Sequence, residues 1–194
     1  MINEGMETEA GLSMEAINVG AVIMDMQANL LGSIGSRENL KDSMILQIKI
    51  FKALNIPLCL TEQVPSKLGS TVPEISSTCA GDPVFDKNTF SAFGSSEFNN
   101  WIKSNSLKHL LVSGIETPIC IYQTCIDALR HNIKVTLVSD CIGARRQADG
   151  ETTLAQLRSF GCCLIPLEAI TYSLLSNSTH EQFRNISGLI RERD

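Results

Sequence analysis

The sequence lacks the long apolar segment and the basic surface that would mark a membrane-spanning or a nucleic-acid-binding protein. No apolar run approaches the roughly 20 residues that a helix needs to cross a bilayer. The net charge is −5, and aromatic residues make up only 5% of the chain, with no stripe of interleaved basic and aromatic residues. Neither a membrane nor a nucleic-acid partner is expected, because binding to phosphate backbones relies on clustered positive charge.

Several signature motifs are also missing. No glycine occurs at 24–27, after the first apolar run, which argues against a dinucleotide fingerprint, and no P-loop is present. Paired C-x-x-C motifs and Cys/His clusters are absent, so we expect no zinc site and no other cofactor. The histidines, His109, His131 and His180, lie at a strand start, a helix end and the C-terminal segment. None is placed to form a Cys-His protease pair.

The cysteines indicate a reducing environment. There are seven, an odd number, in a chain that is not short and has no recognisable signal peptide. This pattern is typical of free thiols in an intracellular protein rather than of a disulfide framework. Residues 1–16 include glutamates but no Lys or Arg, unlike a mitochondrial transit peptide. We therefore expect a cytoplasmic protein and leave a mitochondrial association open.

Length and element order predict one α/β domain at 17–194 with a helical C-terminal tail, preceded by a flexible leader at 1–16. Continuous apolar runs, typical of strands buried on both faces, alternate with segments of helical periodicity. The expected strands are 19–24, 56–60, 84–87, 109–113, 133–138 and 162–165, and the expected helices are 38–54, 97–102, 118–129, 150–160, 167–175 and 183–193. Residues 64–83, rich in Pro, Gly, Ser and Thr, are expected to form a long loop. This order predicts a Rossmann-like parallel sheet with helices on both faces.

Three reactive side chains follow three of the predicted strands. Asp25 follows the first strand, Lys87 ends the short third strand, and Cys120 opens the helix after the fourth. The carboxyl ends of parallel strands lie along one edge of a sheet, so the three side chains can meet in one crevice. Simpler interpretations stay open: Asp25 as the cap of a turn, Lys87 as a surface residue and Cys120 as a packing thiol.

Cys120 is the strongest candidate for a nucleophile. The apolar run at 109–113 leads through Gly114 into a helix whose first turn contains Pro118, where the missing backbone donor is not needed. The positive end of the helix dipole favours a thiolate at this position. Because no histidine is suitably placed, Asp25 is the nearest candidate for the general base.

Four motifs in this order resemble the isochorismatase-like cysteine hydrolase superfamily. They are Asp25-Met26-Gln27, Thr61-Glu62-Gln63 with the residues up to Glu74, Lys87-x-x-x-Ser91-Ala92-Phe93, and Gly114-Ile115-Glu116-Thr117-x-x-Cys120. The second motif is similar to the isochorismatase domain-containing branch. The resemblance runs from about 19 to about 173 and implies a three-layer αβα sandwich with a six-stranded parallel sheet.

The resemblance also implies how the site is built. Asp25, Lys87 and Cys120 correspond to the catalytic triad of the superfamily. The superfamily holds a cis peptide bond before the nucleophile helix, which corresponds here to Ile115–Glu116. That bond directs the backbone N–H of Glu116 toward the N–H of Cys120, and together they form an oxyanion hole.

Some departures from the superfamily narrow the expected chemistry. Its nicotinamidases bind a metal through an Asp-x-His motif after the second strand, where this chain has Thr61-Glu62-Gln63. We therefore expect no metal and no nicotinamidase activity. Pro118 stands where many relatives have a histidine, which alters the expected pocket. The residues expected to line that pocket are Gln63, Phe90, Phe93 and the 64–83 loop.

The nucleophile favours acyl chemistry over the vinyl-ether cleavage of true isochorismate hydrolases. We predict a hydrolase that acts on a small carbonyl compound, with a C–N amide as the first choice, through a thioester on Cys120. Two rival functions stay open: a scaffold or binding protein with the same fold, and an RNA-associated protein, because ribonuclease is a suggested label within the branch. Oligomers are common in the superfamily, so a homo-oligomer is expected.

Overall fold

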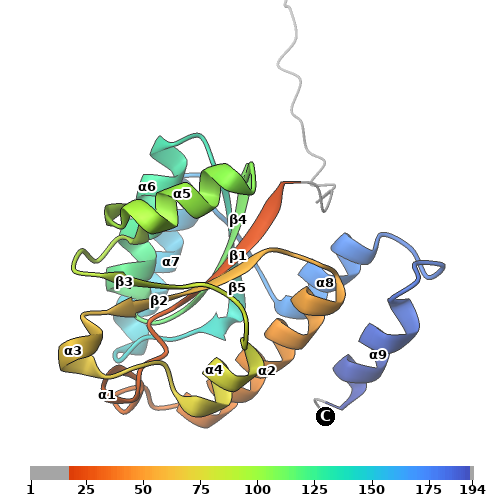
Figure 1. The fold of residues 1–194 in the computed structure, drawn as a ribbon, viewed down its shortest axis with the longest axis horizontal. Helices are drawn as coiled ribbons and strands as arrows, with labels where there is room; N and C mark the ends of the chain where they lie inside the picture. The colour runs from red at the N-terminus through yellow and green to blue at the C-terminus, as the bar shows by residue number, and fades with distance from the viewer. Residues whose placement is uncertain (1–17, 193–194) are drawn as a thin grey trace, which may run out of the picture.

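The computed structural model describes residues 18–192 and contains a six-stranded parallel sheet (Figure 1). Its strands are β1 (Val19–Met24), β2 (Leu58–Gln63), β3 (Val84–Lys87), β4 (His109–Gly114), β5 (Lys134–Ile142) and β6 (Cys163–Ile165). They are arranged in the order β3-β2-β1-β4-β5-β6, and all neighbours are parallel. The predicted fold class is confirmed. The predicted leader, 1–16, lies outside the described residues.

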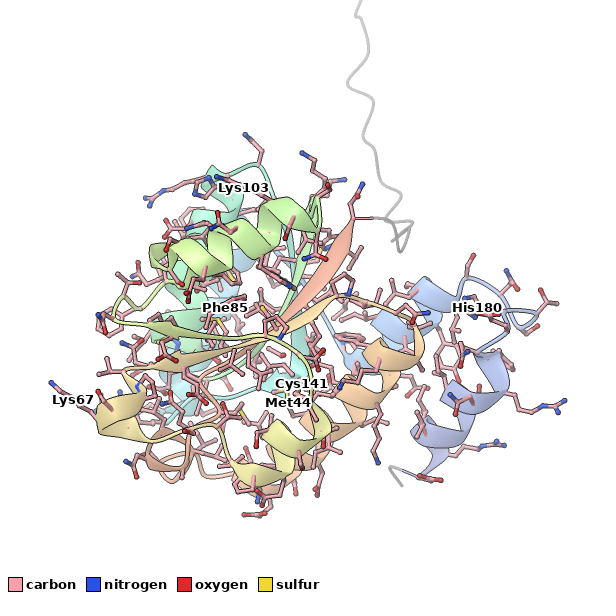
Figure 2. All side chains as sticks on the ribbon, viewed as in Figure 1. Met44, Lys67, Phe85, Lys103, Cys141 and His180 are labelled. Atoms are coloured by element: carbon pink, nitrogen blue, oxygen red, sulfur yellow. The ribbon has the colours of Figure 1, made fainter. Side chains whose placement is uncertain are left out.

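Helices cover both faces of the sheet and complete the three layers (Figure 1). One face carries α2 (Arg37–Ala53), α4 (Pro73–Thr78), α8 (Leu167–Leu175) and α9 (Phe183–Arg191), and the other carries α5 (Ser96–Ser104), α6 (Tyr122–Arg130) and α7 (Gln147–Ser159). Because the central strands are buried on both sides, each face has its own apolar core. Met44 and Cys141 belong to the core under α2, and Phe85 to the core under α5 (Figure 2). No helix within 18–192 has the length and apolarity of a membrane span.

The segment 64–83, expected as a loop, contains two short helices. They are α3 (Pro65–Leu68) and α4, and each begins at a proline. Proline is favoured at the first helical position, because its fixed φ suits the helix and its missing N–H has no partner there. The Pro residues that suggested a loop therefore mark helix starts. Two more short helices, α1 (Ala28–Leu31) and the 3₁₀ helix Ala92–Gly94, also follow strand ends.

Other boundaries also differ from the expectation. Strand β2 runs over Leu58–Gln63 rather than 56–60, so Thr61-Glu62-Gln63, expected after the strand, lies within it. Helix α7 begins at Gln147, three residues before the expected start at 150, so Asp149 lies in its first turn. Strand β5 continues to Ile142, past the predicted end at 138. A register shift between Val112 and Gly114 on β4 allows Ile142 to pair with Gly114, and this irregularity cannot be read from an apolar run.

A buried histidine at the start of β4 makes the stability of the fold depend on pH. The Nε2 atom of His109 lies 2.8 Å from Oγ1 of Thr136, and the ring is buried. Burial, helped by the charge of Lys134, lowers the pKa of His109 to about 4. The unfolded chain binds this proton near the ordinary pKa of 6.5, whereas the folded protein does not. Stability therefore falls as the pH drops through the window between these two values.

The His109→Gln variant is expected to lose this pH dependence. Between pH 6.5 and pH 4 the wild-type protein should lose about 2–3 kcal/mol of unfolding free energy more than the variant. Urea denaturation at a series of pH values measures the difference. His180→Gln, in the loop before α9, is the control and should follow the wild-type curve (Figure 2). If the stability of His109→Gln and of the wild type changed with pH in parallel, the lowered pKa of His109 would be contradicted.

Candidate active site

The predicted site residues lie where the strand order of the sheet reverses. From β1 the chain first builds one side of the sheet, with β2 and β3, and then the other side, with β4, β5 and β6. Open α/β sheets bind ligands at the carboxyl ends of their strands next to such a reversal. Asp25 follows β1, and the turn from Gly114 to Cys120 follows β4, so they flank this point. Lys87, the last residue of β3, reaches the same edge.

Asp25 and Lys87 form an ion pair inside the protein. The Nζ atom of Lys87 donates a hydrogen bond of 2.7 Å to Oδ2 of Asp25, and both side chains are 0% exposed. The Oγ1 atom of Thr61 donates to Oδ1 of Asp25 at 2.8 Å. The interpretation of Lys87 as a surface residue is wrong, because a buried carboxylate compensates the charge that would otherwise keep it in water.

Asp25 has an unusual backbone as well as a buried carboxylate. Its φ is +55°, in the left-handed region, and its N–H donates to the carbonyl of Thr61 at 3.0 Å. Such a conformation costs about 1–3 kcal/mol for a residue other than glycine and recurs at functional sites. Burial raises the pKa of Asp25 above its ordinary value, while Lys87, and to a lesser extent Cys120 and Thr61, oppose that rise.

Cys120 lies on a π-helical turn, Thr117–Ile121, that precedes α6. It is 5% exposed, and its Sγ lies 3.9 Å from Oε1 of Gln63. Burial, followed by the charge of Asp25, raises the pKa of Cys120 to about 12 against the opposing effect of Lys87. The thiolate expected from the helix dipole is therefore not the resting state, because desolvation and the carboxylate outweigh the dipole. The thiol rests protonated beside a carboxylate that can accept its proton.

The turn that leads to Cys120 depends on its backbone geometry. Gly114 has a φ of +109°, and a Cβ atom there would lie 2.1 Å from the carbonyl oxygen of Met24, so only glycine fits. The Ile115–Glu116 peptide bond is cis, as the family resemblance implies. The N–H and Oγ1 of Thr117 both donate to the carbonyl of Gly143, at 2.9 Å and 2.8 Å, which fixes the turn against the end of β5.

The side chain of Glu116 is fully engaged away from Cys120. Arg145 donates its backbone N–H to Oε1 of Glu116 and its Nε–H to Oε2, the latter at 2.7 Å. Glu116 is 9% exposed, whereas the side chain of Arg145 is mostly in solvent. The carboxylate of Glu116 thus anchors the turn, and its backbone remains as the part of the residue that can serve chemistry.

The two phenylalanines predicted to line the substrate pocket lie outside the cluster of Asp25, Lys87 and Cys120. Phe90 is 57% exposed. Phe93 stacks on the ring of His131, with ring centroids 5.0 Å apart. These aromatic residues line a surface pocket beside α6 whose lining contains no member of that cluster. Contact of Phe90 and Phe93 with a substrate stays a prediction.

Two polar partners inside the site were not predicted from the sequence. Thr61, which bonds to Asp25, stands opposite Met24 in the register of β1 and β2, and that register could have indicated the contact. Gln27 is completely buried and bonds to the backbone of Gln63. Within 18–192 no three side chains of His, Cys, Asp or Glu gather as metal ligands. The absence of a metal stays a prediction.

Comparison with known proteins identifies relatives across most of the chain. A family model described as the isochorismatase domain matches residues 20–169. Isochorismatase domain-containing protein 2 from Bos taurus is 34% identical over 145 residues, which cover 75% of this chain and 70% of the relative. Isochorismatase family protein 1A from Dictyostelium discoideum is 30% identical over 176 residues, which cover 88% of this chain and 85% of the relative.

Solved structures agree with the sequence relatives. The structure of the MAR1 ribonuclease from Caenorhabditis elegans has a TM-score of 0.86 at 27% identity and covers 91% of each chain. The octameric YcaC hydrolase from Escherichia coli has a TM-score of 0.84, covering 96% of this chain and 100% of its own, and its 18% identity shows the fold alone. Because the family model spans most of the sequence and the fold agrees, the chain belongs to the isochorismatase family.

Proposed function

We propose that the protein is a cysteine hydrolase that cleaves a small carbonyl compound, with a C–N amide as the first choice, through a thioester on Cys120. The observation that carries this proposal is a thiol beside a completely buried Asp25–Lys87 ion pair at the reversal of strand order. Buried ion pairs contribute little to stability, so such a pair next to a thiol favours a chemical role. The isochorismatase family, with its hydrolase fold, supports the same reaction class.

In the first half-reaction Asp25 takes the proton of Cys120, and Lys87 stabilises the thiolate. The sulfur forms a bond to the carbonyl carbon of the substrate, and the π electrons of that carbonyl move to its oxygen. The backbone N–H groups of Glu116 and Cys120 donate to this oxyanion. The oxyanion then re-forms the carbonyl, the C–N bond breaks, and the leaving amine takes the proton that Asp25 held.

In the second half-reaction water cleaves the thioester. Asp25, again a carboxylate, accepts a proton from the water as its oxygen attacks the thioester carbon, and the same N–H groups hold the oxyanion. The C–S bond breaks, and the sulfur takes the proton back from Asp25. The products are a carboxylic acid and the free thiol, so the site returns to its starting state with no cofactor involved.

Alkylation of Cys120 by iodoacetamide against pH, followed by mass spectrometry, tests whether the site is assembled. Cys120 is expected to react faster than the buried Cys125. Because the charge of Asp25 raises the pKa of Cys120, Asp25→Asn is expected to speed alkylation about tenfold at a given pH. The same variant should lose amide turnover, since no group is left to carry the proton.

Asp86→Asn is the matched control for this experiment, because Asp86 precedes Lys87 on β3 but is exposed. It should leave the alkylation profile of Cys120 unchanged. A wild-type Cys120 that reacts no faster than Cys125, with a profile that Asp25→Asn does not move, would contradict the proposed chemistry. The scaffold function would then be favoured.

The comparisons also bear on assembly and on the RNA-associated alternative. One neighbour is an octameric hydrolase, and we propose a homo-oligomer for this chain as well.

Another neighbour is named a ribonuclease. The net charge of −5 weighs against RNA binding here, because counterion release from RNA requires clustered Lys and Arg. We therefore favour hydrolysis of a small molecule.

A further inference from the structure

We propose that two buried glutamines, Gln63 and Gln27, are positioning residues of the active site. The side-chain carbonyl of Gln63 holds the ammonium of Lys87 between Asp25 and Cys120, and the side-chain amide of Gln27 holds the backbone of Gln63. This role rests on the proposed cysteine chemistry and adds residues to it that lie outside the triad.

Both ends of the Gln63 side chain are bonded, which fixes its orientation. Its Oε1 accepts a hydrogen bond of 2.6 Å from Nζ of Lys87 and lies 3.9 Å from Sγ of Cys120. Its Nε2 donates to the carbonyl of Asn88, the residue after Lys87, at 3.1 Å. A residue that binds substrate needs a free donor or acceptor, and these contacts use both lone pairs of Oε1 and one of the two N–H groups of Nε2, which leaves Gln63 a single N–H. Positioning therefore fits Gln63 better than the predicted place in the pocket lining.

Gln27 binds the backbone of Gln63 as a neighbouring strand would. Its Oε1 accepts from the N–H of Gln63 at 2.8 Å, and its Nε2 donates to the carbonyl of Gln63 at 3.1 Å. The same Nε2 also donates to the carbonyl of Gly69. Gln27 is 0% exposed, so all of its polar contacts are internal. The side chain thus joins the ends of β1 and β2 to the segment before α4 and fixes the position from which Gln63 reaches Lys87.

The neutrality of Gln63 suits the reaction. Once Asp25 has taken the proton of Cys120, the ammonium of Lys87 is the positive charge left to stabilise the thiolate. A carboxylate at position 63 would hold the ammonium equally well but would add a negative charge beside the sulfur. An amide oxygen fixes the ammonium without that charge, so Lys87 can still stabilise negative charge on both Asp25 and Cys120.

The Gln63→Glu variant tests the charge argument. It should slow alkylation of Cys120 by iodoacetamide at least tenfold at pH 8 and move the pH profile upward, opposite in sign to the effect of Asp25→Asn. Gln123→Glu is the matched control, since it makes the same change one helical turn after Cys120 but at an exposed position. The control should follow the wild-type profile. If Gln63→Glu follows it too, the charge argument is overturned.

The ammonium of Lys87 gives a second readout that does not depend on the thiol. In protein labelled with ¹⁵N-lysine, a buried ammonium gives a resonance with slow proton exchange, and its loss in Lys87→Met assigns it. Exchange should be at least tenfold faster in Gln63→Met and in Gln27→Met. Gln47→Met is the control. Gln47 is a buried glutamine on α2 whose side chain bonds to Ser113, and its replacement should leave the exchange rate of the Lys87 ammonium unchanged.

These two measurements separate the inference from the proposed function. Unchanged exchange in both Gln63→Met and Gln27→Met would overturn the positioning role, even if Asp25→Asn alters the reactivity of Cys120. Faster exchange in those variants would support the positioning role, even if Cys120 proves unreactive and the hydrolase proposal fails.

Discussion

The Cys120→Ala variant is expected to abolish hydrolysis of any amide that the wild-type protein cleaves, with a loss of about 10⁴-fold or more. The reason is chemical, because the sulfur is the atom that bonds to the substrate carbon and no neighbouring group can replace it. Structure should be retained, since alanine leaves only a small void at a residue that is 5% exposed on the π-helical turn. Ammonia or amine release from a panel of small amides measures the effect.

Cys125→Ala is the matched control for this prediction. Cys125 is also buried, on α6 just after the π-helical turn, but it belongs to the core, and its free thiol is hydrogen-bonded to the thiol of Cys162 rather than to Asp25. Its loss should change turnover no more than a few-fold. After an acid quench, the wild-type protein should carry the mass of the acyl group on the peptide that contains Cys120. Turnover that survives in Cys120→Ala would contradict a thioester mechanism.

The sequence predicted the fold because parallel strands buried on both faces leave a strong signal. Val19–Met24 is apolar throughout and His109–Gly114 has an apolar centre, both strands are buried along their whole length, and segments of helical periodicity separate such runs along the chain. The exact starts and ends of the helices and strands were less predictable. Pro65 and Pro73 suggested a loop by composition, yet both open helices, because proline is compatible with a first turn and with a loop alike.

The site was only partly predictable, for a physical reason. The positions of Asp25, Lys87 and Cys120 follow from strand ends, whereas their electrostatics depend on burial. A pKa of Cys120 raised to about 12 reflects desolvation and the carboxylate of Asp25, neither of which the helix position of the residue shows. The bonds between the amide of Gln27 and the backbone of Gln63 arise where two strands end side by side, which is a tertiary contact that no local pattern encodes.

The Lys87→Met variant is expected to destabilise the protein by about 3–5 kcal/mol at pH 7, because it leaves a buried carboxylate without its counter-ion. The side chains of Lys87 and Asp25 are both 0% exposed, so water cannot replace the lost partner. Lys87 lowers the pKa of Asp25 against the effect of burial, and its removal must raise that pKa further. Folded Asp25 then binds a proton more readily than the unfolded chain does, so the destabilisation should shrink as the pH falls.

A double-mutant cycle with Asp25→Asn separates the pair from its parts. Asp25→Asn alone leaves the ammonium of Lys87 with the neutral Gln63 as its acceptor and should also destabilise the protein. The double variant removes both charges and is expected to recover to within about 1–2 kcal/mol of the wild type, or to exceed it. Urea denaturation of the four proteins gives the coupling energy. The surface pair of Lys41 and Glu74, whose Nζ and Oε1 atoms are 3.0 Å apart, should show little coupling.

The stability of the double variant, compared with the wild type and the single variants, shows why the chain keeps a buried ion pair. A double variant as stable as the wild type, but unable to release amine from any amide, would mean that Asp25 and Lys87 are retained for proton transfer and not for folding. A double variant less stable than either single variant would mean that the two side chains stabilise the fold through packing and through their bonds to Thr61 and Gln63. The buried charges could then belong to a scaffold that never uses Cys120. Stability and turnover measured on the same four proteins therefore distinguish the hydrolase from its strongest rival.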